Sequence, residues 1–265
     1  MKGIILAGGT ATRLFPLTAT TSKQLLPVYD RQMIFYPLNT LIKAGIRDIL
    51  IIVAPEHSGQ FLNLLGSIFK KYNIHLLFDV QKVPRGLAEA FILGESFIDK
   101  DNVTLILGDN IFQDNFSLQI KNFKSGGHVF AKKVKDPERF GVVKFDARNK
   151  AVKIVEKPEK WISDYAVTGL YIYDSRVVAA AKALKPSERG EIEITDLNNF
   201  YLQKNELKVT VFGGEWLDAG TFDALLEAGK IVKEKKLYEN FHPVINRAIC
   251  EFNGELKEIC KKRLL

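Results

Sequence analysis

Apolar and amphipathic stretches alternate along the first half of the chain. Four short runs are apolar at nearly every position, which is typical of strands buried on both faces of a parallel sheet. These runs are Gly3–Leu6, Asp48–Val53, Ile74–Phe78 and Val103–Leu107. Stretches with helical spacing separate them, at Met33–Ala44, Ser58–Lys70 and Leu87–Phe97. This order predicts an α/β fold with an open, mostly parallel, Rossmann-like sheet flanked by helices.

The second half of the chain is richer in strands. Four β-like runs follow one another closely, at Val129–Val134, Val142–Phe145, Val152–Val155 and Val167–Tyr173. Connections this short favour antiparallel pairing or an added sheet edge. Helices are expected again at Ser175–Leu184, Ile194–Lys204 and Thr221–Lys235, with a strand at Lys208–Phe212. We therefore expect a mixed sheet that carries an inserted β-rich region.

The last segment, Pro243–Leu265, has the pattern of two short amphipathic helices broken near Gly254. The rest of the chain contains no repeat and no low-complexity linker. A chain of 265 residues can bury a full core as one domain. We predict a main domain over residues 1–240 and a short C-terminal helical extension over residues 241–265.

Composition narrows the classes of partner. The net charge of +7 suits anionic partners, but there is no aromatic and basic motif of the RNA-binding type, so we expect no nucleic-acid partner. No run approaches the ~20 apolar residues that span a bilayer, and the N-terminal apolar stretch is too short for a signal peptide. These features predict a cytoplasmic protein without a membrane partner. The two cysteines and four histidines have no metal or triad spacing.

A glycine-rich segment directly follows the first predicted strand. From Leu6 to Pro27 it has the sequence LAGGTATRLFPLTATTSKQLLP. A strand that breaks into glycines presents bare backbone N–H groups, which can hold phosphate oxygens. Arg13 and Lys23 add positive charge to the same segment. The pattern is neither a P-loop nor a dinucleotide-binding G-x-G-x-x-G, and it indicates a site for a polyphosphate.

Two aspartates stand where predicted strands end. Asp109 follows Gly108 after one strand, and Asp218 occurs in the sequence Trp216 to Thr221, which opens a helix. Ligands of open α/β sheets bind at the carboxyl ends of strands, where carboxylates can hold Mg²⁺ beside a phosphate. The alternatives are a turn or cap role for Asp109 and a helix cap for Asp218.

Two further loops contain candidate polar groups. Glu156 and Lys157 end another strand, where they could accept from substrate hydroxyls and pair with a phosphate; the alternative is a surface turn closed by Pro158. Gln81 precedes a loop and a helix, and its amide offers a donor and an acceptor to a pyrimidine edge. An exposed loop glutamine is the alternative.

Taken together, these motifs resemble those of the sugar-1-phosphate nucleotidyltransferases. The similarity runs from Met1 to about Lys235 in the family's order and spacing, which makes it far more specific than any single motif. Its carriers are the glycine-rich segment through Pro27, Gln81–Ala90, Leu107–Asn110, Asp136–Val143, Glu156–Pro158, Tyr165–Tyr171, Arg189–Asp196 and Trp216–Thr221.

The resemblance implies transfer of a nucleotidyl group to a sugar phosphate, assisted by Mg²⁺. Within the family, overall similarity favours dTTP and glucose 1-phosphate as substrates, giving dTDP-glucose and pyrophosphate by in-line attack on the α-phosphorus. The same chemistry with UTP or another sugar 1-phosphate, or a non-catalytic protein that binds nucleotide-sugars, remains open. The family also implies a homo-oligomer, either a dimer or a tetramer.

The resemblance assigns roles residue by residue. The implied catalytic residues are Arg13, Lys23, Asp109, Lys157 and Asp218, of which Asp109 and Asp218 hold the metal. The implied nucleotide-binding positions are Leu6, Gly8, Gly9, Thr10, Ala11, Thr12, Arg13, Gln24, Gln81, Pro84, Gly86 and Asp109. The implied sugar-phosphate positions are Asn110, Gly141, Glu156, Lys157, Val167 and Tyr171.

The chain departs from the family pattern in three places. Ala11 stands where the family usually has glycine, which would cost about 1 kcal/mol if the site needs a positive φ. Arg85 stands where an acidic residue commonly precedes Gly86. The tail is shorter than in the family's long form, whose extension helps to form a regulatory site and tetramer contacts.

Overall fold

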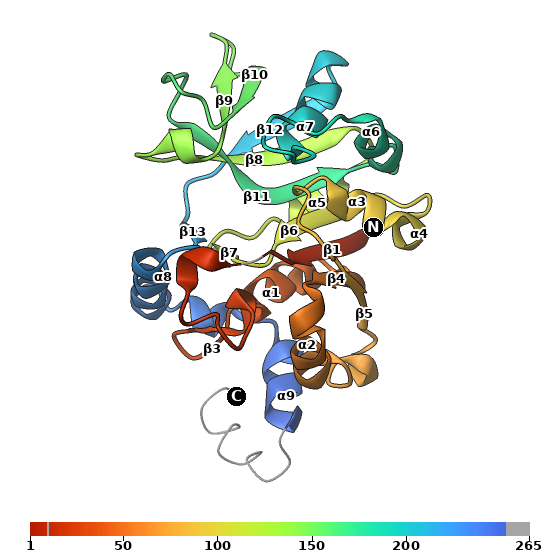
Figure 1. The fold of residues 1–265 in the computed structure, drawn as a ribbon, viewed down its shortest axis with the longest axis vertical. Coiled ribbons are helices and arrows are strands. Elements are labelled where there is room, and N and C mark those ends of the chain that lie inside the picture. The colour runs from red at the N-terminus through yellow and green to blue at the C-terminus, as the bar shows by residue number, and fades with distance from the viewer. Residues whose placement is uncertain (10, 253–265) are drawn as a thin grey trace.

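One mixed sheet of nine strands runs through the molecule (Figure 1). The computed structural model describes residues 1–9 and 11–252. Its first four strands are mutually parallel, in the order β6, β1, β4, β5. Their bounds are β1 (Lys2–Ala7), β4 (Asp48–Val53), β5 (His75–Val80) and β6 (Val103–Leu107). The predicted parallel α/β sheet is therefore confirmed.

The second half extends this sheet with antiparallel strands, as its short connections predict. Their bounds are β8 (Gly127–Lys133), β9 (Gly141–Phe145), β10 (Ala151–Glu156), β11 (Tyr165–Tyr173) and β12 (Leu207–Val211). β11 joins the two parts, because it pairs antiparallel with β6, β8 and β9. β10 pairs with β9, and β12 is parallel to β8. These strands form the β-rich upper part of Figure 1.

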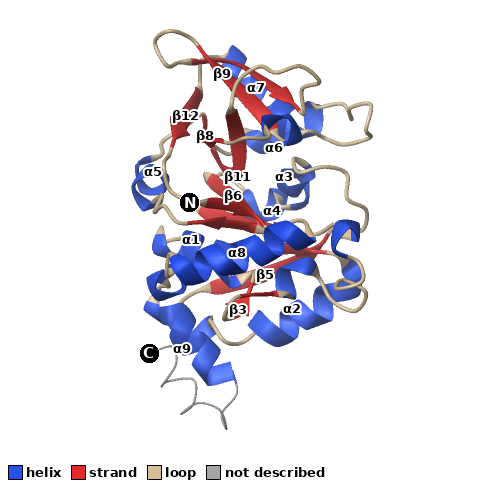
Figure 2. Cartoon of the chain, turned by 90° about the vertical axis from the view of Figure 1, so that its left-hand side faces the viewer, coloured by secondary structure: helices blue, strands red, loops and turns tan. Residues whose placement is uncertain are grey.

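Helices cover both faces of the sheet (Figures 1 and 2). Their bounds are α1 (Phe35–Lys43), α2 (Ser58–Leu65), α3 (Glu89–Leu93), α4 (Glu95–Ile98), α5 (Ser117–Asn122), α6 (Val177–Ala183), α7 (Ile194–Gln203), α8 (Phe222–Glu234) and α9 (Pro243–Phe252). α2 ends at Leu65, five residues earlier than predicted. The helix predicted over 87–97 is two helices divided at Gly94, where a side chain would press on Ile4.

The core lies on both sides of the sheet, which explains the continuous apolar runs. Neighbouring residues of β1 enter different clusters: Ile5 packs with the α1 side, whereas Ile4 packs with the side that holds α3 and α6. Both side chains are fully buried. In α9, Ile245 and Ala248 join the α1-side cluster. The domain boundary at residue 240 stays a prediction, and the helix break predicted near Gly254 lies outside the described residues.

Two short antiparallel pairs add to the main sheet, and of their four strands the sequence analysis located only the one that ends at Asp218. β2 (Pro27–Val28) pairs with β3 (Arg31–Gln32), and β7 (Asn110–Phe112) pairs with β13 (Trp216–Asp218). Each has too few residues to show a period. The β7–β13 pair is antiparallel and sets Asn110 opposite Asp218, which brings the two strand-end aspartates to one place.

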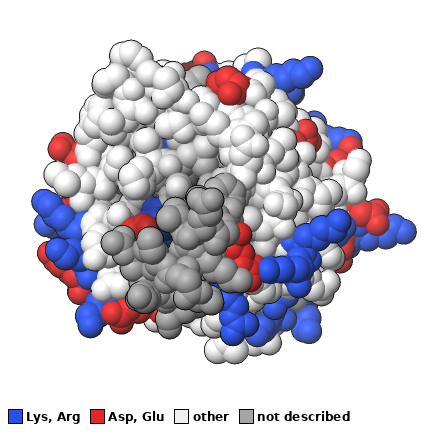
Figure 3. Space-filling model, turned by 90° about the horizontal axis from the view of Figure 1, so that it is seen from below, with Lys and Arg blue, Asp and Glu red and all other residues white. Residues whose placement is uncertain are grey.

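Within residues 1–9 and 11–252, no helix combines the length and the apolar character needed to cross a membrane. On the face that carries the C-terminal helix, basic and acidic side chains lie interspersed around the rim (Figure 3).

Candidate active site

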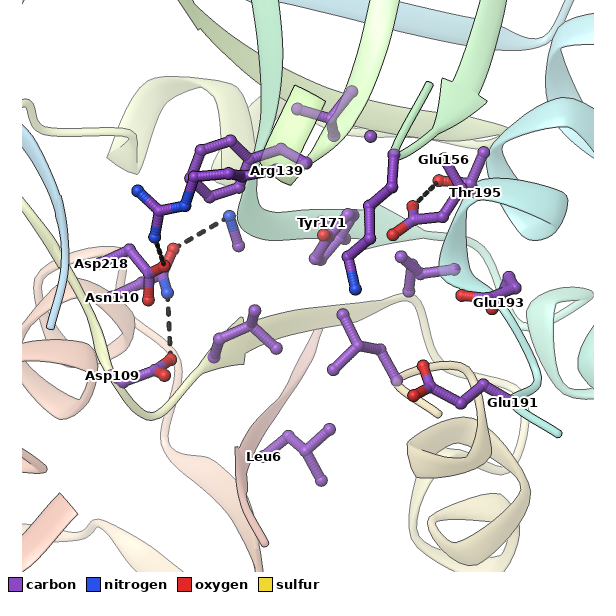
Figure 4. A pocket seen from close by; sticks show the side chains of 18 of the residues that line it. Leu6, Asp109, Asn110, Arg139, Glu156, Tyr171, Glu191, Glu193, Thr195 and Asp218 are labelled. Carbon is purple, nitrogen blue, oxygen red and sulfur yellow. Dashed lines mark hydrogen bonds and ion pairs between the residues drawn. The ribbon is translucent and has the colours of Figure 1, made fainter. Parts of the chain in front are cut away.

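A pocket of about 560 Å³ opens between the parallel sheet and the β-rich part. Figure 4 shows it divided into two sides, with Asp109, Asp218 and Arg139 on one side and Glu156, Thr195 and Glu193 on the other. Many of the predicted site residues line it. They are Leu6, Gly8, Arg13, Lys23, Gln24, Asp109, Asn110, Gly141, Glu156, Lys157, Val167, Tyr171 and Asp218.

The remaining predicted residues are not among those that line this pocket. They are Gly9, Ala11, Thr12, Gln81, Pro84 and Gly86. Thr10 lies outside the described residues.

The parallel pairing of β1 and β6 explains why Gly8 and Asp109 meet. Leu6 is in register with Leu107, so the residues after both strands emerge at one edge of the sheet. The backbone N–H of Gly108 donates to the Leu6 carbonyl at 2.9 Å. A Cβ at Gly108 would lie 2.9 Å from the Gln24 side chain, so glycine is needed for this close approach.

Asp109 is paired with the ammonium of Lys23, and both side chains are mostly buried. Burial would raise the pKa of Asp109, but the Lys23 ammonium outweighs it and lowers the pKa. Asp109 also accepts a bond from the Asn110 amide at 3.1 Å. No helix starts at Asp109, because β7 begins at the next residue. Asp109 therefore lies in the turn between β6 and β7, as one of its alternatives expected, and it lines the pocket without capping a helix.

Asp218 lies on β13 at the same side of the pocket. The backbone N–H of Ala219 donates to the Asp109 carbonyl at 3.2 Å, which ties the two segments together. Burial, followed by the neighbouring Asp109 carboxylate, raises the pKa of Asp218 to about 6. The cap of α8 is Thr221, whose hydroxyl accepts from Ala224 N–H at 3.3 Å. Asp218 is therefore free of the capping role considered as its alternative.

The pair of carboxylates fits a divalent cation. Ionised Asp109 and Asp218 repel each other, and a cation between them would relieve this cost. Across the part of the chain that the structure describes, no group of three or more His, Cys, Asp or Glu side chains could hold a metal. Mg²⁺ is commonly bound by one or two carboxylates together with water and substrate phosphates, so two aspartates suit it.

Two arginines flank Asp218. The guanidinium of Arg139 lies 3.8 Å from the Asp218 carboxylate (Figure 4). It also lies 2.6 Å from the Asp136 carboxylate. Arg13 comes from the glycine-rich segment, and a Cβ at Gly220 would lie 3.5 Å from its guanidinium. Lys23, Arg13 and Arg139 thus gather positive charge around the carboxylates, an arrangement that suits the oxygens of a polyphosphate.

Asn110 connects three parts of the site. Its amide oxygen accepts from the indole N–H of Trp216 at 2.6 Å and from the backbone N–H of Gly169 at 3.1 Å. Its amide nitrogen donates to Asp109. A Cβ at Gly169 would lie 2.5 Å from the same amide oxygen. Asn110, predicted as a sugar-phosphate residue, therefore also joins β7, β11 and β13.

The other side of the pocket is acidic and polar. The Thr195 hydroxyl donates to Glu156 at 2.6 Å (Figure 4). Arg189 bonds Glu193 at 2.8 Å and lies 3.4 Å from Glu156. A Cβ at Gly141 would come within 2.9 Å of the Thr195 hydroxyl. Oriented carboxylates of this kind can accept hydrogen bonds from several hydroxyls of a ligand.

The wall between the two sides is formed by β11 and the residue that follows β10. Val167 and Tyr171 of β11 are buried and line the pocket. Burial raises the pKa of the Tyr171 phenol, which stays neutral. Lys157 takes a φ of +39°, and its backbone N–H donates to the Phe140 carbonyl at 3.0 Å. This backbone turn brings the Lys157 side chain to the pocket.

Ala11 takes the left-handed conformation that its glycine-like position suggests. Its φ is +46° and its ψ is 32°, directly before the 3-10 turn Thr12–Leu14 that carries Arg13. The Thr18 hydroxyl donates to the Ala11 carbonyl at 3.1 Å. A non-glycine residue in this region costs about 1 kcal/mol or more. The chain therefore holds Ala11 in a strained backbone conformation.

The predicted base-binding loop packs behind the glycine-rich turn. Gln81 is buried, and a Cβ at Gly8 would lie 2.6 Å from its amide oxygen. Gly86 has a φ of +100°, and a Cβ there would lie 2.4 Å from the Ile192 carbonyl. Ile192 N–H donates to the Arg85 carbonyl at 2.7 Å. Gly86 therefore allows this loop to dock on the segment that carries Glu191 and Glu193.

Several pocket residues received no role from the sequence. Arg139, Phe140 and Trp216 lie near Asp218, and the rings of Phe140 and Trp216 are 5.0 Å apart. Thr195 and Glu193 lie on the other side. All five lie within recognisable motifs, but a motif does not reveal which of its side chains reach a ligand. Buried Glu89, which bonds Gln81, gave no chemical signal in the sequence.

Comparison with known proteins agrees with this geometry. Residues 2–235 match the nucleotidyl transferase family. Glucose-1-phosphate thymidylyltransferase of Neisseria meningitidis is 52% identical over 264 residues, covering 97% of this chain and 91% of the relative. Glucose-1-phosphate thymidylyltransferase of Mycolicibacterium smegmatis is 50% identical, covering 89% of this chain and 84% of the relative.

Solved structures give the same result. A candidate glucose-1-phosphate thymidylyltransferase from Bacillus anthracis, crystallised with sucrose, is 44% identical, has a TM-score of 0.83, and is matched over 88% of this chain and 96% of its own. A UDP-glucose pyrophosphorylase is 22% identical with a TM-score of 0.77, over 88% of this chain and 98% of its own, and shares the fold. With this fold, this pocket and a match over residues 2–235, the chain belongs to the nucleotidyl transferase family.

Proposed function

We propose that the protein is a glucose-1-phosphate thymidylyltransferase, which converts glucose 1-phosphate and dTTP to dTDP-glucose and pyrophosphate. The carrying observation is the two-sided pocket, in which one side gathers cations and aspartates and the other presents oriented carboxylates. The relatives named for this activity, at about half identity over most of the chain, support the choice of substrates.

The reaction needs positioning and charge stabilisation more than covalent chemistry. The phosphate oxygen of the sugar attacks the α-phosphorus in line, and pyrophosphate leaves. We assign Arg13 and the backbone after β1 to the β- and γ-phosphates, and Lys23 to the charge that develops at the α-phosphate. Bonds that strengthen in the transition state lower the barrier, whereas equal binding of ground and transition states does not.

The sugar phosphate is held from the other side. We assign Lys157 to its phosphate and Glu156 to its hydroxyls, with Gly141, Val167 and Tyr171 shaping the pocket. Thr195 donates to one Glu156 oxygen, and Arg189 approaches the other at 3.4 Å, so a sugar hydroxyl would share this second oxygen with Arg189. Asn110 positions Asp109 and the Trp216 ring.

Magnesium completes the proposal. Asp109 and Asp218 would hold it, and it would supply positive charge to the nucleotide phosphates. Lys23 is paired with Asp109, and a metal held by Asp109 would leave the Lys23 ammonium available to the α-phosphate. The cytoplasmic location and the homo-oligomeric state stay predictions.

A matrix of nucleotides and sugar phosphates tests the function. The protein is incubated with Mg²⁺, one of dTTP, UTP or dCTP, and one of several sugar 1-phosphates, and pyrophosphate release is measured. We expect the highest kcat/KM for dTTP with glucose 1-phosphate, and background release from the Asp109→Asn variant. Release no greater than that variant's with every pair would contradict the assignment, and a preference for UTP would correct the nucleotide.

A further inference from the structure

We propose that Glu89 is a positioning residue that selects a pyrimidine with an N3–H group, thymine or uracil, over cytosine by fixing the amide of Gln81. This inference deepens the proposed function and rests on it, because it concerns how the nucleotide of that reaction is chosen. Neither Glu89 nor Gln81 is among the residues that line the pocket; Gln81 lies against Gly8, which does line it, and Glu89 acts through Gln81.

The Glu89 carboxylate holds the side chains of Gln81 and Arg85 in place. Its side chain is buried at the start of α3, and one of its oxygens accepts from the Gln81 amide nitrogen at 2.8 Å and from Arg85 N–H at 3.2 Å. The other oxygen holds the Arg85 guanidinium, at 2.8 Å from Nε and 2.6 Å from the terminal nitrogen. Both oxygens of this buried carboxylate are therefore occupied, which is the condition under which a buried charge is tolerated.

These contacts allow one orientation of the Gln81 amide. A carboxylate only accepts hydrogen bonds, so the amide face turned toward Glu89 must be the nitrogen. The amide oxygen then points to the opposite side, where it meets the turn at Gly8, a residue of the pocket wall. Gln81 itself is anchored by its backbone N–H, which donates to the Val53 carbonyl at 2.9 Å at the end of β4.

The fixed orientation of the Gln81 amide distinguishes bases by the group at N3. Thymine and uracil present an N3–H donor flanked by carbonyl oxygens, which matches an amide oxygen facing N3. Cytosine presents an N3 lone pair instead, so two acceptors would face each other unless the amide turned over. Turning it would set the Gln81 oxygen against the Glu89 carboxylate, so two acceptors would face each other in a buried place with no donor between them.

Arg85 fits the same scheme. It stands where the family commonly has an acidic residue, and its guanidinium neutralises Glu89 from the exposed side of the loop. We infer that this departure serves the Glu89 carboxylate and has no direct contact with the base.

The test is the ratio of kcat/KM for dTTP to kcat/KM for dCTP, with glucose 1-phosphate saturating. The Glu89→Gln variant keeps the size of the side chain but can donate as well as accept, so the Gln81 amide can turn. We expect this ratio to fall at least about tenfold, because sites built around a specific hydrogen bond discriminate through it. The KM for glucose 1-phosphate should stay unchanged.

Arg85→Lys is the matched control. It alters the other partner of the same carboxylate and leaves the Gln81 bond in place, so the dTTP to dCTP ratio should keep its wild-type value. If Glu89 had only a structural role, Glu89→Gln would lower kcat/KM for dTTP and for dCTP by the same factor. The ratio would then stay unchanged, which would overturn the proposal. If Glu89→Gln does not fold, the double variant Arg85→Gln, Glu89→Gln removes the unpaired guanidinium and is measured instead.

Calorimetry separates this proposal from the proposed function. Titration with dTDP and dCDP measures base discrimination without turnover. Preference for dTDP that weakens in Glu89→Gln supports the proposal even if pyrophosphate release fails in every pair, in which case the function alone is wrong. Equal affinity of the wild-type protein for dTDP and dCDP would overturn the proposal even if the enzyme is active.

Discussion

The ammonium of Lys23 contacts the carboxylate of Asp109, although the two residues are 86 positions apart in the sequence. Both side chains are mostly buried, and the contact joins the glycine-rich segment to the end of β6. Lys23 therefore neutralises one of two neighbouring carboxylates in the free protein, and the same ammonium is available to a phosphate when substrate and metal bind.

Replacing Lys23 by Ala should reduce kcat at least about 100-fold, the cost typical of removing one preorganised group that stabilises charge in a transition state. Steady-state pyrophosphate release checks this. Lys100→Ala, at an exposed lysine in the turn before β6, is the control and should keep wild-type turnover. Turnover of Lys23→Ala near the wild-type value would show that Lys23 only balances charge.

Asp218→Asn should stabilise the metal-free protein. The raised pKa of about 6 means that ionising Asp218 costs more in the folded chain than in the unfolded chain. Below about pH 4 the carboxyl is neutral in both the folded and the unfolded chain. As pH rises through 6, the free energy of unfolding of the wild-type protein falls by up to about 3 kcal/mol relative to the variant. Urea unfolding in EDTA at pH 5 and pH 8 measures this growing difference.

Two comparisons make the Asp218 result specific. Asp223→Asn removes an exposed carboxylate from the first turn of α8, where a negative charge is favourable, so it should lower stability slightly. Mg²⁺ should raise the unfolding temperature of the wild-type protein but not of Asp218→Asn. A variant less stable than wild type at pH 8 in EDTA would contradict the repulsion between Asp218 and Asp109.

His128 should make the protein sensitive to acid. Burial, with a smaller effect of Lys208, lowers the pKa of His128 to about 4. The unfolded chain takes up a proton near pH 6.5, whereas the folded chain resists until about pH 4, so stability falls as pH drops through this interval. The free energy of unfolding falls by about 3 kcal/mol across this interval. Urea unfolding of wild type and His128→Gln at pH 7 and pH 4.5 should show a smaller loss in the variant; equal losses would argue against this.

Ala11→Gly should raise the free energy of unfolding by about 0.5 kcal/mol. Glycine relieves the cost of φ = +46°, and part of that gain is offset by the greater freedom of glycine in the unfolded chain. Ala19→Gly, in the same segment, is the control and should lower stability, because Ala19 is not among the residues with positive φ. Loss of stability in both variants would mean that the Ala11 conformation carries no strain.

Much of the fold follows from local patterns. β4 and β6 have the bounds predicted for them, because strands buried on both faces are apolar at nearly every position. Short elements such as β7 and β2 were not predicted, since two or three residues show no period and depend on their partners. The helix predicted over 87–97 is divided at Gly94, where a side chain would press on Ile4, a contact that sequence spacing does not reveal.

The sequence by itself determined the α/β class, the glycine-rich turn and the residue types of a phosphate and metal site, because these depend on neighbours along the chain. Only the tertiary structure decided that Lys23 meets Asp109, that Arg139 flanks Asp218, and that Thr195 orients Glu156. It also decided which face of the Gln81 amide meets Glu89. These contacts join segments that are far apart in the sequence. The order of the strands and the pairing of buried charges bring them together, and the local spacing of residues predicts neither.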